Sequence, residues 1–199
     1  MATVFAGFTM SLDGFIANPD DSTEGLFDWF ASGDTEYLLP GGKMTVRLSP
    51  ASAMVMRDIW QRVGAVVAGR RMFDIAHGWG GSHPLNVPVF VVSHSIPEGW
   101  PRDDAPFTFV IGVADGVESA IEQAKQVAGD KLVIVAGANI AQQALKAGLV
   151  DELELDLVPV LLGRGIRAFE YLGIEPVKLE RIFAVLAPDV THLRFRVKR

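Results

Sequence analysis

Short apolar runs alternate with segments of helical period along most of this chain. Apolar stripes at helical spacing are typical of helices that cover a sheet, and they lie at Pro50–Val63, Val117–Val127 and Asn139–Leu145. The short runs are apolar on both alternate faces, as expected for buried strands, and they lie at Val4–Met10, Ala65–Ala68, Val87–Val92, Phe107–Ile111 and Leu132–Val135. Strands that alternate with helices predict a mostly parallel sheet with helices on its faces.

The pattern changes toward the C-terminus. In Glu152–Leu157, leucines alternate with acidic residues, so we expect a strand that buries its leucines and turns Glu152, Glu154 and Asp156 to water. Val177–Ala187 and Val190–Val197 then flank a Pro-Asp turn and predict a closing antiparallel hairpin. The expected fold is therefore α/β, with a mostly parallel sheet flanked by helices and an antiparallel C-terminal hairpin.

Length and composition narrow the classes of protein. The 199 residues contain no linker or repeat and predict one domain over residues 1–199. A net charge of −6 gives no electrostatic footprint for nucleic acid. The chain has no cysteine, which excludes thiolate metal sites, and its histidines form no set of ligands, so no metal is expected. Without a signal-peptide pattern or the roughly 20 apolar residues of a membrane span, a cytoplasmic protein with no membrane partner is expected.

One stretch, KLVIVAGANIAQQALKAG at residues 131–148, has the order expected of an anion site. The small residues 136–138, with Gly137 at their centre, end the buried strand Leu132–Val135, and a helix begins at Asn139 and stops at Gly148. The first N–H groups of such a helix are unpaired and lie at the positive end of its dipole, which suits a phosphate or pyrophosphate. A tight turn without a ligand is the alternative, and the stretch lacks the GxGxxG dinucleotide fingerprint.

A second group of anion-binding type follows the strand Ala65–Ala68. Arg70 and Arg71 come directly after Gly69, where the next helix is expected to begin. Guanidinium groups offer paired donors and a permanent charge, which suits a phosphate monoester. A solvated pair of surface charges is the alternative.

Residues 18–49 are expected to form a long polar connection that holds Phe27, Trp29 and Phe30. Loops of this length are usually functional lids or disordered segments, and the aromatic residues argue against disorder. We expect a lid whose aromatic side chains bind a ring-shaped substrate. The alternative is a segment folded onto its own domain, or onto a second subunit, without ligand contact.

Taken together, five motifs resemble the dihydrofolate reductase-like fold, and specifically the reductase domain of the bacterial riboflavin-pathway deaminase–reductase. They occur in the same order and cover nearly the whole chain. They are TMSLDGFIA (Thr9–Ala17), GRRMFD (Gly69–Asp74), VFVVSHS (Val89–Ser95), VAGANIAQQAL (Val135–Leu145) and LVDELELDLVPVLLGRG (Leu149–Gly165). The zinc deaminase half of that family is not expected, because its metal requires cysteine ligands.

The resemblance implies an NADPH-dependent reductase that transfers a hydride to a small conjugated or heterocyclic substrate, pterin- or pyrimidine-like. It implies that the adenosine 2′-phosphate lies by Gly69, Arg70, Arg71, Met72, Ser93 and His94. It places the pyrophosphate at Gly137, Ala138, Asn139, Ile140 and Ala141, and the nicotinamide beside Thr9, Ile16 and Ala17.

The expected proton donor is Asp13 or an ordered water. Stabilising the turn before Gly14 is the alternative role for this carboxylate. Because members of the family commonly pair, and because the terminal hairpin exposes a strand edge, a homodimer is expected. Two other functions remain open: a non-catalytic member of the fold that binds a nucleotide or a protein, and an NADPH-dependent enzyme acting on an unrelated carbonyl compound.

Overall fold

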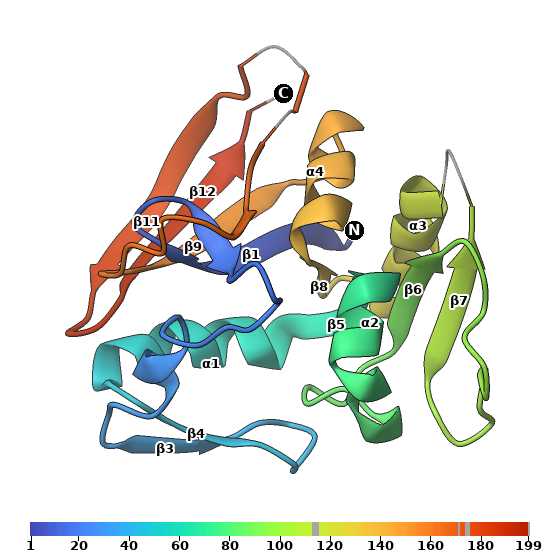
Figure 1. Ribbon diagram of the computed structural model, residues 1–199, viewed down its shortest axis with the longest axis horizontal. Helices are drawn as coiled ribbons and strands as arrows, with labels where there is room; N and C mark the ends of the chain where they lie inside the picture. The colour runs from blue at the N-terminus through green and yellow to red at the C-terminus, as the bar shows by residue number, and fades with distance from the viewer. Residues whose placement is uncertain (113–115, 171, 174–175, 199) are drawn as a thin grey trace.

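An eight-stranded sheet organises the chain (Figure 1). The computed structural model describes residues 1–112, 116–170, 172–173 and 176–198. From edge to edge the strands are β11 (Leu179–Leu186), β12 (Thr191–Val197), β9 (Glu152–Val158), β1 (Thr3–Ser11), β8 (Leu132–Ala136), β5 (Val63–Gly69), β6 (Val89–Ser93) and β7 (Phe107–Ile111). The strands from β9 to β7 are parallel, and β12 and β11 are antiparallel to their neighbours. The mostly parallel sheet and the C-terminal hairpin expected from the sequence are confirmed.

Helices cover both faces of the sheet. The side chains of β1 alternate between the two faces, with Val4 and Phe8 in one hydrophobic core and Phe5 in the other. The first core contains residues of α3 (Gly116–Ala128) and α4 (Ala138–Lys146), and the second contains residues of α1 (Pro50–Arg62) and α2 (Arg70–Ile75). Burial on both faces explains why the parallel strands read as continuous apolar runs.

The helix boundaries follow local chemistry. Ser49 caps α1, because its Oγ accepts a hydrogen bond from the backbone N–H of Ser52 at 3.2 Å and Pro50 occupies the first helical position. Past the end of α4, Gly148 has a φ of +66°, and its N–H donates to the carbonyl of Leu145 at 3.0 Å. Both ends therefore lie where the sequence predicts them.

Residues 18–49 are not one uninterrupted loop. They contain the 3₁₀ turn η1 (Asp28–Phe30) and a small antiparallel hairpin of β3 (Thr35–Leu38) and β4 (Thr45–Leu48). The segment packs on the α1 side of the sheet through buried side chains, namely Leu26, Trp29, Leu39, Val46 and Leu48. A further 3₁₀ segment, η2 (His77–Gly81), follows α2.

The expectation that the acidic face of β9 meets water is wrong. Glu154 is 2% exposed and Asp156 is 8% exposed. The partner strand β12 explains this, because its own alternation presents His192 opposite Asp156 and Arg194 opposite Glu154. The alternation of residues along β9 shows that the strand has an apolar and an acidic face. It does not show that α1 packs over the acidic face.

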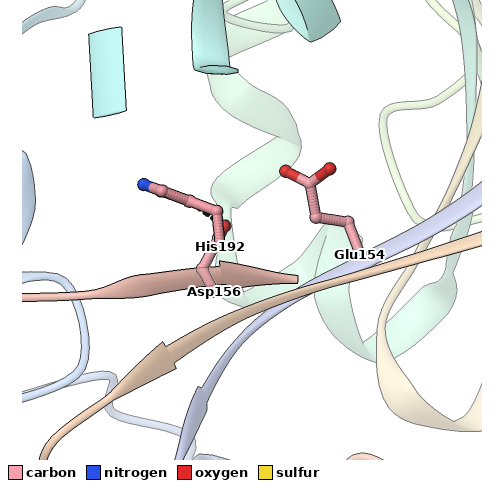
Figure 2. Close-up of side chains that lie close together, drawn as sticks. All are labelled: Glu154, Asp156 and His192. Carbon is pink, nitrogen blue, oxygen red and sulfur yellow. Dashed lines mark hydrogen bonds and ion pairs between the residues drawn. The ribbon is translucent and has the colours of Figure 1, made fainter. Parts of the chain in front are cut away.

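These four side chains form a buried polar network, part of which is drawn in Figure 2. His192 Nδ1 lies 2.6 Å from Asp156 Oδ1, and His192 Nε2 lies 2.9 Å from Ser52 Oγ of α1. The Nε of Arg194 donates to Glu154 Oε2 at 2.6 Å. Because a buried polar group that loses its hydrogen-bond partner destabilises the folded state, the network fixes β12 against β9 and α1.

A short two-stranded ladder lies beside the carboxyl end of β1. It joins β2 (Phe15–Ala17) to β10 (Ile166–Arg167), and Ile166 pairs with Ala17. The close approach of these two segments of the backbone requires a glycine, since a Cβ on Gly165 would lie 2.1 Å from the carbonyl oxygen of Ala17. Gly165 has a φ of +149°, which also favours glycine.

We predict that Gly165→Ala destabilises the protein more than Gly163→Ala. Both residues have positive φ, so each alanine costs about 1–2 kcal/mol in the left-handed region. Only Gly165 adds a steric clash, because nothing lies within 4 Å of a Cβ built on Gly163. Urea denaturation of the two variants measures the difference, and equal losses of unfolding free energy would contradict the packing described for this ladder.

The buried network predicts a specific dependence of stability on pH. Burial, followed by the nearby charge of Asp156, raises the pKa of Glu154 from 4.5 to about 8, against the opposing effect of Arg194. Asp58 of α1 adds a further raising effect. The folded state therefore favours the neutral acid. The contribution of Glu154 to the free energy of unfolding is fully present below pH 4.5 and is lost as the pH rises through about 8.

Glu154→Gln should flatten that decline, because the amide keeps an acceptor for Arg194 and cannot ionise. The change in unfolding free energy between pH 5 and pH 8 should shrink by an amount on the order of a few kcal/mol. Burial also raises the pKa of Asp156, so a residual slope should remain. Glu152→Gln, on the same strand but half-buried, is the matched control and should keep the wild-type slope. A Glu154→Gln variant with an unchanged slope would show that Glu154 is not the titrating group.

Candidate functional site

A cavity of about 730 Å³ opens at the carboxyl ends of β5, β6 and β8. Segments far apart in the sequence line it, since parallel strands bring the turns that follow them to the same edge of the sheet. The lining includes the β2 region (Ile16, Ala17, Asp21, Thr23), the start of α2 (Gly69–Met72), the end of β6 (Val92–His94) and the turn from β8 into α4 (Ala136–Ile140), and Gly116 and Val117 of α3 and Ile166 of β10 also contribute to it. A cavity of this size falls in the range of small-molecule and cofactor sites.

The turn from β8 into α4 supplies backbone donors. Gly137 precedes the helix with a φ of +91°, which an L side chain would rarely adopt. No side chain caps the helix. The N–H groups of Ala138, Asn139 and Ile140 belong to its first turn, where α-helical geometry offers them no partner within the helix. The three residues line the cavity, and their N–H groups together with the positive end of the helix dipole favour the binding of an anion there.

The start of α2 supplies two guanidinium groups, and each is held by a carboxylate. The Nε of Arg70 donates to both oxygens of Asp74, at 2.8 and 2.9 Å, and its Nη1 donates to the carbonyl of Ser95 at 3.1 Å. Arg71 donates from Nε and Nη2 to Oδ2 of Asp21, at 3.0 and 2.8 Å. Both arginines line the cavity, and each is held in an ion pair, although the side chain of Arg71 is still 68% exposed.

The structure brings together most of the residues expected to bind a cofactor. Thr9 and Ala141 are the exceptions: both are buried, and neither lines the cavity. Those that do line it are Ile16, Ala17, Gly69, Arg70, Arg71, Met72, Ser93, His94, Gly137, Ala138, Asn139 and Ile140.

Sequence reasoning missed several lining residues, of which Asp21, Gln143 and Ile166 are examples. Gln143 follows Asn139 by one helical turn and donates to it at 2.6 Å, so helical spacing alone predicts that the two share a face. Asp21 and Ile166 reach the cavity through tertiary contacts that no local pattern encodes.

Asp13 does not have the surroundings of a proton donor. Its carboxylate accepts hydrogen bonds from Ser11 Oγ at 2.6 Å, Leu162 N at 3.1 Å and Gly163 N at 2.7 Å. These donors, the Ser11 hydroxyl first, hold the pKa of Asp13 below its usual value. The carboxylate ties the turn after β1 to the segment before β10, so its stabilising role is the one that the geometry supports.

The aromatic cluster of residues 27–30 is also placed differently from the expected lid. Trp29 is 2% exposed, and its ring centroid lies 4.4 Å from that of Phe30 and 5.3 Å from that of His192. Phe27 packs edge-on against Phe30 at 5.2 Å. None of the three lines the cavity, and the alternative of a segment folded onto its own domain describes them.

Within the described ranges, one group of side chains has the donor types of a metal centre, namely Glu154, Asp156 and His192. Their potential ligand atoms lie within 4.8 Å of one another (Figure 2). Both ring nitrogens of His192 are already hydrogen-bonded, and the guanidinium of Arg194 lies against Glu154. A cation would have to displace these bonds beside an existing positive charge, so the group is better described as the buried polar network.

For the part of the chain that the structure covers, no helix is both long and apolar enough to cross a membrane.

Similar proteins share this architecture. A protein of Bacillus subtilis (strain 168) named YwjB, itself uncharacterized, is 25% identical over 166 residues, which cover 83% of this chain and 82% of YwjB. A crystal structure from Shewanella sp. PV-4, whose name places it provisionally in riboflavin biosynthesis, is 25% identical, covers 100% of both chains and has a TM-score of 0.70. Dihydrofolate reductase from Enterococcus faecalis, complexed with NADP(H), has 11% identity and a TM-score of 0.59, covering 99% of this chain and 97% of the reductase.

The last likeness shows the dihydrofolate reductase-like fold. The sequence profile of the RibD C-terminal domain matches residues 2–190, which is nearly the whole chain. The resemblance stated from the five motifs is therefore confirmed: this chain belongs to the RibD C-terminal domain family.

Proposed function

We propose that this protein is an NADPH-dependent reductase that transfers a hydride to a small conjugated or heterocyclic substrate, pterin- or pyrimidine-like. The observation that carries the proposal is the cavity, in which a helix N-terminus and an arginine group face the same space. A dinucleotide with a 2′-phosphate has separate phosphate groups, and the cavity offers separate places for them. Family membership and the NADP(H) complex of a reductase with the same fold support this choice of cofactor.

The residues present fit such a cofactor. The N–H groups of Ala138, Asn139 and Ile140 would hold the pyrophosphate. Arg70, fixed by Asp74, would bind the 2′-phosphate from the neighbouring wall, with Ser93 and His94 on the same side. The small and apolar side chains of Ile16, Ala17, Ala136 and Ile166 would border the nicotinamide.

When bound, the cofactor supplies the hydride, and the chain orients the two reacting rings and excludes water. The β2–β10 ladder would contribute to both on one side of the cavity. The close contact between Gly165 and Ala17 holds an apolar wall of the cavity in place. Reduction also requires a proton at the substrate. Since the pKa of Asp13 is lowered and its oxygens are engaged, an ordered water is the better source of that proton.

The homodimer stays a prediction. The edge strand β11 exposes Leu179, Ile182 and Leu186, which a second copy would cover.

Cofactor preference tests the proposal. NADPH should bind more tightly than NADH by about tenfold or more, because a charge-assisted contact contributes roughly 1.5–3 kcal/mol. Arg70→Ala should remove most of this preference, with little effect on NADH affinity. Arg62→Ala is a matched control, since Arg62 forms the same kind of helical ion pair with Asp58 on α1 and does not line the cavity.

Calorimetric titration of both cofactors gives these affinities directly. Equal affinity of the wild type for NADPH and NADH would contradict the assignment of the 2′-phosphate site. Binding of NADPH without turnover of any pterin- or pyrimidine-like compound would instead favour the non-catalytic alternative.

A further inference from the structure

We propose that Asp21 sets the affinity and selectivity of the cavity by competing with a phosphate group for Arg71. This inference rests on the proposed function, because the competing phosphate belongs to the dinucleotide. It concerns a residue outside the five family motifs.

The ion pair between Asp21 and Arg71 forms part of the cavity lining. Asp21 follows β2 and Arg71 lies in the first turn of α2, so the pair joins segments 50 residues apart, and both side chains line the cavity. Two donors of Arg71 converge on the same oxygen, Oδ2, at 3.0 and 2.8 Å. Two of the guanidinium nitrogens that could donate to an anion, Nε and Nη2, are therefore already bound to a carboxylate.

The position of Asp21 is set by a hydrogen-bonded turn. The N–H of Asp21 donates to the carbonyl of Asn18 at 3.0 Å, and the N–H of Asn18 donates to the carbonyl of Ser22 at 2.8 Å. The side chain of Asn18 also donates to Ser22 Oγ at 3.0 Å, and the N–H of Ser22 donates to Asp20 Oδ1 at 3.1 Å. The turn presents Asp21 with its side chain 22% exposed, against 68% for Arg71.

Electrostatic repulsion controls the entry of a phosphate group. A carboxylate and a phosphate are both anionic acceptors, and two of them on one guanidinium repel each other. The entering phosphate must either displace Asp21 from Arg71 or bind to Arg71 beside the negative charge of the Asp21 carboxylate. A ligand with several phosphate charges offsets this cost through the helix N-terminus and Arg70, and a ligand with a single phosphate offsets less of it. Asp21 thus lowers the affinity for phosphate ligands, most strongly for those with the fewest charges.

The test compares NADPH affinity in the wild type, Asp21→Asn and Asp20→Asn. Asp21→Asn should bind NADPH roughly three- to tenfold more tightly, since an exposed ion pair and a like-charge repulsion are removed together. Asp20→Asn is the matched control. It removes one negative charge from the same turn, keeps an acceptor for the N–H of Ser22 and leaves the Asp21–Arg71 pair intact, so its affinity should stay within twofold of the wild type.

The same substitution in an Arg71→Ala background tests the route of the effect. If Asp21 acts by occupying Arg71, Asp21→Asn should tighten NADPH binding much less when Arg71 is absent. The proposal is overturned if Asp21→Asn binds NADPH no more tightly than the wild type and Asp20→Asn. It is also overturned if the full gain persists without Arg71, because the effect would then be general repulsion.

A parallel titration with inorganic pyrophosphate separates this inference from the proposed function. Pyrophosphate binding that tightens in Asp21→Asn, with no NADPH binding to any variant, would support the competition and contradict the cofactor. NADPH binding that is equal in all variants would support the cofactor and contradict the competition. Failure of both probes to bind any variant would overturn both.

Discussion

Parallel pairing of β1 with β8 on one side and with β9 on the other holds the two halves of the molecule together. On the β8 side, the following strands and helices bring their turns to one edge and form the cavity. On the β9 side, the antiparallel strand β12 closes the fold with charged side chains. The site therefore depends on a strand that contributes little to it directly: β1 fixes where β8 ends and where the β2–β10 ladder begins.

The polar network gives the second half of the sheet its specificity. Glu154 and Asp156 are buried, and each has a partner on β12 at 2.6 Å. Shifting β12 by one residue would place either Leu193 and Phe195 or Thr191 and Leu193 opposite Asp156 and Glu154, and would leave these buried carboxyl groups without their partners. Ser52 then links the network to the first turn of α1. The register of the hairpin and the position of α1 are in this way set by the same few bonds.

Much of the fold could be predicted from the sequence because its strands and helices are periodic and well bounded. Ser49-Pro50 and Gly148 mark helix ends through local chemistry, and the structure places both as expected. The turn at Gly137 was recognisable for the same reason. The alternation of β9 gave the correct two faces, but a period of two carries no information about which face another element covers. Burial of the acidic face depends on His192 and Arg194, about 40 residues later in the chain.

The remaining misses have a similar cause. Trp29 lies in a segment of low local regularity, where an aromatic residue fits a lid and a core equally well, and its contact with His192 decides between them. Asp13 is close in sequence to Ile16 and Ala17, which line the cavity. Hydrogen bonds from the backbone N–H groups of Leu162 and Gly163 nevertheless give its carboxylate a structural role. Asp21 reaches the cavity only because a turn presents it to Arg71. In each case a partner far along the chain determines what the residue does.

The most direct test of the proposed cofactor site is a titration of the isotopically labelled protein with NADPH, in which the backbone amide resonances are followed. The amides of Ala138, Asn139 and Ile140 should shift most and saturate together with those of Arg70 and Arg71, because the phosphates would bind at these two helix starts. The amides of the β3–β4 hairpin, on the α1 side of the sheet, should remain in place. Saturable NADPH binding that leaves residues 138–140 unperturbed, or that shifts the hairpin instead, would contradict the site described for this protein.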